Sequence, residues 1–229
     1  LANIISIASA LRPHEAVIAA VSGHIAMRET GAIEATGHKI ITMPSADGKL
    51  TSDDVRAALQ NNAHAPHMAK PRLVYISNAT EFGTVYTKAE MQSLSATCKE
   101  NGLLFLIDGA RLGAALSADI NDLSLAELAM LSDIFWIGGT KAGALVGEAI
   151  VVCNPQLKDD FSFHIKQRGA LLAKGRLLGI QFVELFRDNL YFDATKHANG
   201  MATKLSGGLT VHGYSLAAAT ESNQVFPIL

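Results

Sequence analysis

The stretch from Ile134 to Gly143 reads Ile-Phe-Trp-Ile-Gly-Gly-Thr-Lys-Ala-Gly. Four apolar residues run straight into two glycines, a pattern typical of a buried strand that ends in a tight loop. The loop carries Lys141, so that its amine emerges at the end of a strand, whereas most lysines lie on solvated surfaces. The stretch therefore predicts a buried sheet with a reactive group at the end of one strand.

Apolar runs of the same kind recur along the chain, and amphipathic stretches separate them. This alternation is typical of βαβ crossovers, in which helices cover both faces of the sheet. The predicted fold class is α/β, with a mainly parallel sheet flanked by helices. The expected strands are Val17–Val21, Lys39–Met43, Leu73–Ser77, Leu103–Asp108, Ile134–Gly138 and Ala149–Cys153.

Helix-entry signals stand between these strands, and Thr51 and Thr87 are expected to cap the first turns of two helices. The expected helical stretches are 51–60, 87–100, 122–131, 157–189 and 197–205. Within the fourth, either a bend or close helix packing is expected at Gly169, Gly175 and Gly179. Further strands are expected at 207–213 and 225–229. This order predicts a large domain over residues 1–190 and the beginning of a small α+β domain over residues 191–229.

The composition narrows the class of protein. Of 229 residues, 49% are apolar and 17% are charged, and the net charge of −2 leaves no basic stripe for nucleic acid. No apolar run is long enough to span a bilayer, so a soluble protein with a small-molecule partner is expected. Two scattered cysteines, Cys98 and Cys153, do not make a disulfide framework, which favours the cytoplasm. The chain begins without Met and ends on Pro-Ile-Leu, so both ends are expected to be cuts in a longer sequence.

Two further polar side chains follow an apolar run. Asp108 closes Leu103–Ile107, and Arg111 follows it in the sequence Asp-Gly-Ala-Arg. Ligands of open α/β sheets bind outside the carboxyl ends of the strands, so both are expected near Lys141. An amine, a carboxylate and a guanidinium together suit pyridoxal phosphate, because the amine forms a Schiff base and the carboxylate keeps the pyridine nitrogen protonated.

Each of these two residues has an alternative role. Asp108 could form a structural ion pair with Arg111 instead of holding a cofactor. Arg111 could be that partner, or its planar guanidinium could bind the α-carboxylate of an amino acid. The sequence leaves these alternatives open.

Other candidates are weaker. His24 closes an apolar run, where an imidazole can stack on a pyridine ring or be an ordinary core histidine. Thr140 offers a hydroxyl to a phosphate group. Gly-Gly-Thr-Lys is not a nucleotide-binding loop, because Ala142 stands where Ser or Thr is required. His64 and His67 lie in a loop with no third ligand nearby, so no metal site is predicted.

Three motifs occur in a fixed order, namely Ser-Gly-His24-Ile, Asp108-Gly-Ala-Arg111 and Gly-Gly-Thr-Lys141. In this order they resemble the low-specificity threonine aldolase group of β-eliminating lyases, within the fold type I pyridoxal phosphate enzymes. The resemblance runs through nearly the whole chain. It implies that Lys141 carries the cofactor, Asp108 pairs with the pyridine nitrogen, His24 stacks on the ring, and Arg111 contacts the cofactor or the substrate carboxylate. It also makes Asn3 a candidate cofactor ligand, because Leu1-Ala2-Asn3 is similar to the end of a phosphate-binding turn.

The resemblance implies an aldehyde-lyase that cleaves the Cα–Cβ bond of β-hydroxy-α-amino acids, giving glycine and acetaldehyde from threonine or allo-threonine. It also implies a homodimer or homotetramer. The alternatives are another fold type I reaction, either β-elimination or transamination, and a truncated relative without activity.

The chain departs from the resemblance at one place. Where the better-known threonine aldolases are expected to present a histidine, it reads Asn78-Ala79-Thr80-Glu81. The base for the β-hydroxyl proton therefore stays open between Glu81 and an ordered water. The segment Lys166–Gly169 resembles a basic stretch near the cofactor or at a subunit contact. Arg168 is accordingly a further candidate, with a solvated helix face as the alternative.

Overall fold

A computed structural model describes the whole chain, residues 1–229. Six strands form one sheet in the order β2-β1-β3-β4-β5-β6. The first five run parallel, and β6 pairs antiparallel with β5. The mainly parallel α/β fold predicted from the sequence is thereby confirmed. The strands are β1 (Glu15–Ala20), β2 (Lys39–Met43), β3 (Lys70–Ser77), β4 (Leu104–Asp108), β5 (Ile134–Gly138) and β6 (Glu148–Val152).

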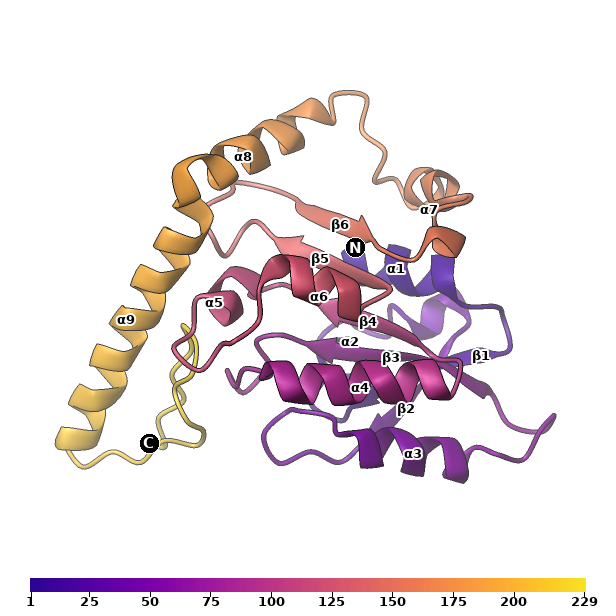
Figure 1. Ribbon diagram of the computed structural model, residues 1–229, viewed down its shortest axis with the longest axis horizontal. Helices are drawn as coiled ribbons and strands as arrows, with labels where there is room; N and C mark the ends of the chain where they lie inside the picture. Colours follow the sequence, from indigo (N-terminus) through magenta and orange to yellow (C-terminus); the bar gives the residue numbers. More distant parts are fainter.

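Nine α-helices precede, connect or follow the strands (Figure 1). Three of them begin with a capping box, formed by Thr51 with Asp54, Thr87 with Glu90, and Ser124 with Glu127. The helix expected from residue 122 therefore starts later, at Leu125. The helices are α1 (Ala2–Ala10), α2 (His24–Met27), α3 (Ser52–Asn61), α4 (Lys88–Glu100), α5 (Leu112–Leu116), α6 (Leu125–Leu131), α7 (Phe161–Gln167), α8 (Arg176–Phe186) and α9 (Leu190–Val211).

The sheet has an apolar core on each face, because successive strand residues point to opposite sides. Ile18, Ile76 and Phe105 belong to the core under α3, α4 and α6. Their chain neighbours Val17, Tyr75 and Leu104 belong to the core that α1 covers. Ile7 of α1 and Leu11, the C-cap residue of that helix, belong to the same core. Burial on both faces explains why the strands read as unbroken apolar runs.

The C-terminal third differs from the sequence prediction. Residues 207–211 continue α9 and are not a strand, although Gly207 and Gly208 weaken a helix by roughly 1 kcal/mol each. The helix is held nearer its start, where Tyr191 and Thr195 pack against Gly113 of α5. The predicted strand at 225–229 is also wrong, because that segment makes only an isolated bridge between Leu216 and Pro227.

The long helical stretch expected over residues 157–189 is interrupted. Gly169 adopts a left-handed conformation with φ of 73°, which ends α7, and Gly175 caps the start of α8. A Cβ at Gly179 would meet no neighbour, so this glycine serves no close packing. Figure 1 shows α8 and α9 following one another as an arm beside the sheet. None of the helices combines the length and apolar composition that crossing a bilayer would need.

Two glycines allow the ends of β4 and β5 to approach closely. A Cβ on Gly109 would lie 1.7 Å from the carbonyl oxygen of Trp136, and a Cβ on Gly138 would lie 2.3 Å from that of Ala110. The backbone of Gly138 instead donates a hydrogen bond to the oxygen of Gly109 at 2.8 Å. This contact brings the Asp108 and Lys141 segments together.

Gly109→Ala is therefore expected to lower the free energy of unfolding by about 3 kcal/mol, because the methyl group must displace backbone. Urea unfolding followed by circular dichroism measures the change. Gly207→Ala is the control, since a Cβ there meets nothing within 4 Å, and it should stabilise the helix by roughly 0.5–1 kcal/mol. Equal effects of the two substitutions would contradict the steric explanation.

Candidate active site

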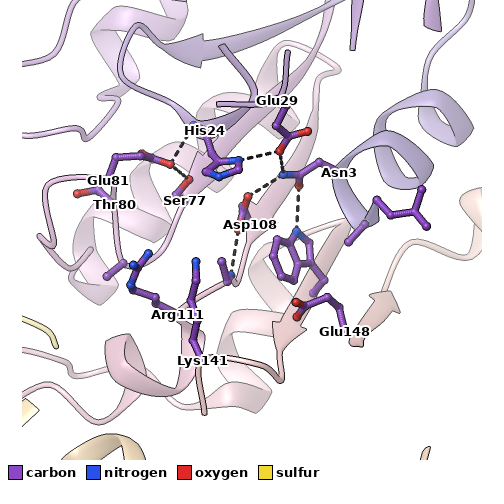
Figure 2. Close-up of a pocket in the computed structure, with 15 residues that line it drawn as sticks. Asn3, His24, Glu29, Ser77, Thr80, Glu81, Asp108, Arg111, Lys141 and Glu148 are labelled. Carbon is purple, nitrogen blue, oxygen red and sulfur yellow. Dashed lines mark hydrogen bonds and ion pairs between the residues drawn. The ribbon is translucent and has the colours of Figure 1, made fainter. Parts of the chain in front are cut away.

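Side chains predicted to be functional gather at the carboxyl ends of the parallel strands. His24 follows β1, Asp108 ends β4, and Lys141 lies in the turn after β5. With Arg111 they line one cavity of about 180 Å³ (Figure 2). Strands β1, β3, β4 and β5 are successive neighbours in the sheet, so their carboxyl ends share one edge.

Asp108 is 3% exposed and accepts three hydrogen bonds. Its Oδ2 accepts from the Tyr75 hydroxyl and from Nδ2 of Asn3 at 2.8 Å, and its Oδ1 accepts from the backbone N–H of Ala110 at 3.0 Å. Burial raises the pKa of Asp108, although all three hydrogen bonds favour its charged form. A buried carboxylate of this kind is stabilised by a positive charge brought into the cavity.

Lys141 and Arg111 supply two basic groups that form no ion pair. Neither residue is among the five ion pairs of the structure, so the alternative of an Asp108–Arg111 pair is wrong. The pKa of Lys141 is lowered, first by loss of solvation and then by the nearby Arg111 charge. Loss of solvation also lowers the pKa of Arg111. The lowered pKa gives Lys141 a larger fraction of neutral, nucleophilic amine.

Asn3 ties the first turn of α1 to the strand ends. Its Nδ2 donates to Asp108 and, at 2.7 Å, to Oε1 of Glu29. Its Oδ1 accepts from Nε1 of Trp136 at 3.0 Å. The amide of Asn3 is thus occupied by protein partners, and what α1 offers to the cavity is the backbone N–H groups of its first turn.

The imidazole of His24 is held in place by a carboxylate. Its Nδ1 lies 2.8 Å from Oε1 of Glu29, and the His24 side chain is 44% exposed toward the cavity. His24 is therefore not a core histidine. The Glu29 contact fixes the ring orientation and leaves Nε2 free.

Several residues of the site were not predicted from the sequence, namely Glu29, Tyr75, Trp136 and Glu148. Oε2 of Glu148 accepts from the backbone N–H of Gly139 at 3.0 Å and so braces the turn that carries Lys141. Burial raises the pKa of Glu148. The sequence did contain a signal that could have placed Glu148 near the site. Only nine residues separate β5 from β6, which is too few for a parallel crossover, so antiparallel pairing could have been predicted. Antiparallel pairing places Glu148 opposite Gly138.

Four other residues considered from the sequence lie outside the cavity. Thr140 is exposed and does not line it. Arg168 caps the end of α7 and contacts Gln167 and His164. His64 and His67 pack edge to face with 4.9 Å between ring centroids and have no third ligand.

Comparison with known proteins shows the family of the chain. A profile of the family described as beta-eliminating lyase matches residues 1–226. The chain belongs to the beta-eliminating lyase family. The low specificity L-threonine aldolase of Pseudomonas sp. strain NCIMB 10558 is 38% identical over 232 aligned positions. The low specificity L-threonine aldolase of Saccharomyces cerevisiae is 24% identical over 230 positions.

Solved structures of the family give the same fold. A structure described as Leishmania major threonine aldolase has a TM-score of 0.97 and 56% identity, covering 99% of this chain and 66% of its own. An Exiguobacterium protein described as a putative aromatic amino acid beta-eliminating lyase/threonine aldolase has a TM-score of 0.71 at 20% identity, covering 97% of this chain and 60% of its own. The alignment with the Pseudomonas sp. relative covers 98% of this chain and 66% of that relative. The alignment with the yeast relative covers 99% of this chain and 58% of that relative. This beta-eliminating lyase chain thus spans at most about two thirds of their length.

Proposed function

We propose that the protein is a pyridoxal phosphate-dependent aldehyde-lyase that cleaves β-hydroxy-α-amino acids such as threonine into glycine and an aldehyde. The observation that carries this proposal is the single cavity that holds the unpaired amine of Lys141 and the buried carboxylate of Asp108. The relatives described as threonine aldolases support the choice of substrate class.

The residues present fit pyridoxal phosphate. Asp108 is a buried carboxylate without a cationic partner, and a protonated pyridine nitrogen would supply one. Lys141 provides the amine that would hold the cofactor covalently. Ala2 and Asn3, in the first turn of α1, line the same cavity, and the backbone N–H groups of a first helical turn are suited to bind a phosphate group.

When bound, pyridoxal phosphate supplies the electron sink for the pair released from the Cα–Cβ bond. The other tasks fall to side chains of this chain. Arg111 would bind the substrate α-carboxylate and so orient the bond that breaks. The lowered pKa of Lys141 makes its amine easy to displace by the substrate amine. His24, held by Glu29, would stack on the ring of the bound cofactor.

A side-by-side assay of the full-length protein tests the proposal. Threonine, allo-threonine, phenylserine and cysteine are supplied with pyridoxal phosphate, and glycine, aldehyde and 2-oxo acids are measured. Glycine and aldehyde from the hydroxy amino acids support aldol cleavage. A 2-oxo acid as the main product, such as 2-oxobutyrate from threonine or pyruvate from cysteine, would point to β-elimination, and a protein that stays colourless with the cofactor would refute cofactor binding.

The pH dependence of covalent cofactor attachment is expected to change in Arg111→Gln. Only the neutral amine of Lys141 attacks, so the attachment rate falls as the pH drops through the pKa of Lys141. Removing the Arg111 charge removes one cause of the lowered pKa of Lys141. The decrease of the attachment rate at low pH should therefore begin at a higher pH. Absorbance changes after mixing, followed from about pH 6 to 10, measure the shift. Arg12→Gln at an exposed position is the control; coinciding profiles of all three proteins would contradict the role of Arg111.

We also infer that the protein forms homo-oligomers in the cytoplasm. Exposed apolar side chains along α8 and the turn beside it support association, because such a surface favours burial. They are Leu145, Val146, Leu172, Leu177, Ile180 and Val183. The free thiols of Cys98 and Cys153 support a reducing compartment. Light scattering of the purified protein gives the oligomeric state, and a monomer at micromolar concentration would refute the association.

A further inference from the structure

Glu81 is a carboxylate that lines the cavity and has no part in the steps described above. It lies in the loop between β3 and α4. Its Oε1 accepts from the backbone N–H of His24 at 2.9 Å and from the hydroxyl of Ser77 at 2.6 Å. No hydrogen bond from another residue reaches its Oε2, so one oxygen is anchored while the other remains available (Figure 2).

The surroundings of Glu81 suit proton transfer. Burial raises its pKa, and the nearby negative charge of Asp108 contributes in the same direction. A carboxyl group with such a pKa can both accept and return a proton. The ionisable groups that face Glu81 from the surrounding elements are His24, Tyr75, Tyr86, Asp108, Arg111 and Lys141.

The position of Glu81 relative to Arg111 distinguishes it from the two other glutamates of the cavity. Figure 2 shows Glu81 and Arg111 on one side of the cavity, and Glu148 with Asn3 on the opposite side. If Arg111 binds the substrate carboxylate, the substrate lies next to Glu81. Glu29 is bonded to Asn3 and His24, whereas the carboxylates whose charges act on Arg111 are Glu81 and Asp108. Glu148 is committed to the backbone of Gly139.

We propose that Glu81 is the catalytic base that accepts the β-hydroxyl proton of the substrate, an assignment that rests on the proposed function. The free oxygen of Glu81 takes the proton, and the O–H electron pair becomes the second C–O bond of the aldehyde. The Cα–Cβ bond breaks, and its electron pair stays with Cα. A proton delivered to Cα then completes glycine, so that no proton or electron is lost overall.

Glu81→Gln tests this assignment cleanly. The amide oxygen of glutamine can still accept from His24 and Ser77, so the loop keeps its anchors while the basic oxygen is lost. In the full-length protein, the kcat of threonine or phenylserine cleavage should fall about 100- to 10,000-fold. Affinity for pyridoxal phosphate, its visible absorbance and the melting temperature without cofactor should match those of the unsubstituted protein.

A second reaction distinguishes loss of the base from damage to the rest of the site. Exchange of the Cα proton of glycine with deuterated water, followed by NMR, involves no β-hydroxyl group, and Glu81→Gln should change its rate by less than about threefold. Glu34→Gln, at an exposed glutamate, is the matched control for both reactions. Full cleavage activity in Glu81→Gln would overturn the assignment alone. Loss of cofactor affinity or of glycine exchange would overturn it in favour of a structural role, and a wild-type protein without any cleavage would overturn the proposed function as well.

Discussion

Lys141→Ala is expected to lower the cleavage rate by a factor on the order of 10,000, because no other lysine lines the cavity. Borohydride reduction of the unsubstituted protein with pyridoxal phosphate should fix the cofactor on the peptide that contains Lys141. In Lys141→Ala the label should be absent from that peptide. Mass spectrometry of the digested protein measures both results.

The surface offers a matched control for this substitution. Lys39 lies on β2 and is exposed, so Lys39→Ala should keep both the label on Lys141 and the cleavage rate. The unfolding curve of Lys141→Ala should stay close to that of the unsubstituted protein, since Lys141 makes no hydrogen bond or ion pair. Label recovered on a different lysine of the unsubstituted protein would disprove the role of Lys141.

The centre of the sheet could be predicted because its signals are local. The apolar runs that form β4 and β5 end at Asp108 and Gly138 as expected. The capping box at Thr87 likewise begins α4 at the predicted place. Each of these boundaries is set by a few neighbouring residues, which a single sequence displays.

Other elements depend on contacts that a sequence does not display. Helix α1 has no side-chain cap and no charged residue, so no local sequence signal predicts it. Its burial against the sheet stabilises it instead. Helix α9 continues through the glycines Gly200, Gly207 and Gly208, because packing on α5 outweighs their low helix propensity. Local signals were misleading wherever tertiary packing decided the structure.

The candidate site divides in the same way. Asp108 and Lys141 were predictable, because parallel strands bring their carboxyl ends to one edge of the sheet. The residues that hold them in place were not. Tyr75 reaches Asp108 from the neighbouring strand, and Glu148 reaches Gly139 only because β6 runs antiparallel. Supporting contacts of this kind depend on strand order and direction, which the apolar pattern leaves undetermined.

Asp108→Asn is expected to lower kcat/KM for cleavage about 1,000-fold, or about 4 kcal/mol, within the range for breaking a buried charge pair. An amide carries no charge to keep a proton on the ring nitrogen, so the cofactor accepts electrons less readily. The absorbance maximum of the bound cofactor should shift as well. Steady-state kinetics and a cofactor titration measure the two effects.

The same substitution is expected to change how stability depends on pH in the cofactor-free protein. Burial raises the folded-state pKa of Asp108 above its ordinary value, so the folded state binds this proton more tightly than the unfolded state. The resulting stabilisation is present below the ordinary pKa, about 3.9, and is lost as the pH rises through the folded-state pKa. Asparagine does not titrate, so Asp108→Asn should lack this loss. Urea unfolding at several pH values compares the two proteins.

Tyr75→Phe separates the charge of Asp108 from its hydrogen bonds. The substitution removes one of the three donors to Asp108 but leaves the carboxylate charged. A hydrogen bond to a charged group contributes roughly 1.5–3 kcal/mol, so Tyr75→Phe should lower kcat/KM by about 10- to 100-fold, less than Asp108→Asn does. If the two substitutions lowered activity equally, the orientation of the carboxyl group would matter and its charge would not, and the pairing of Asp108 with a ring nitrogen would be disproved.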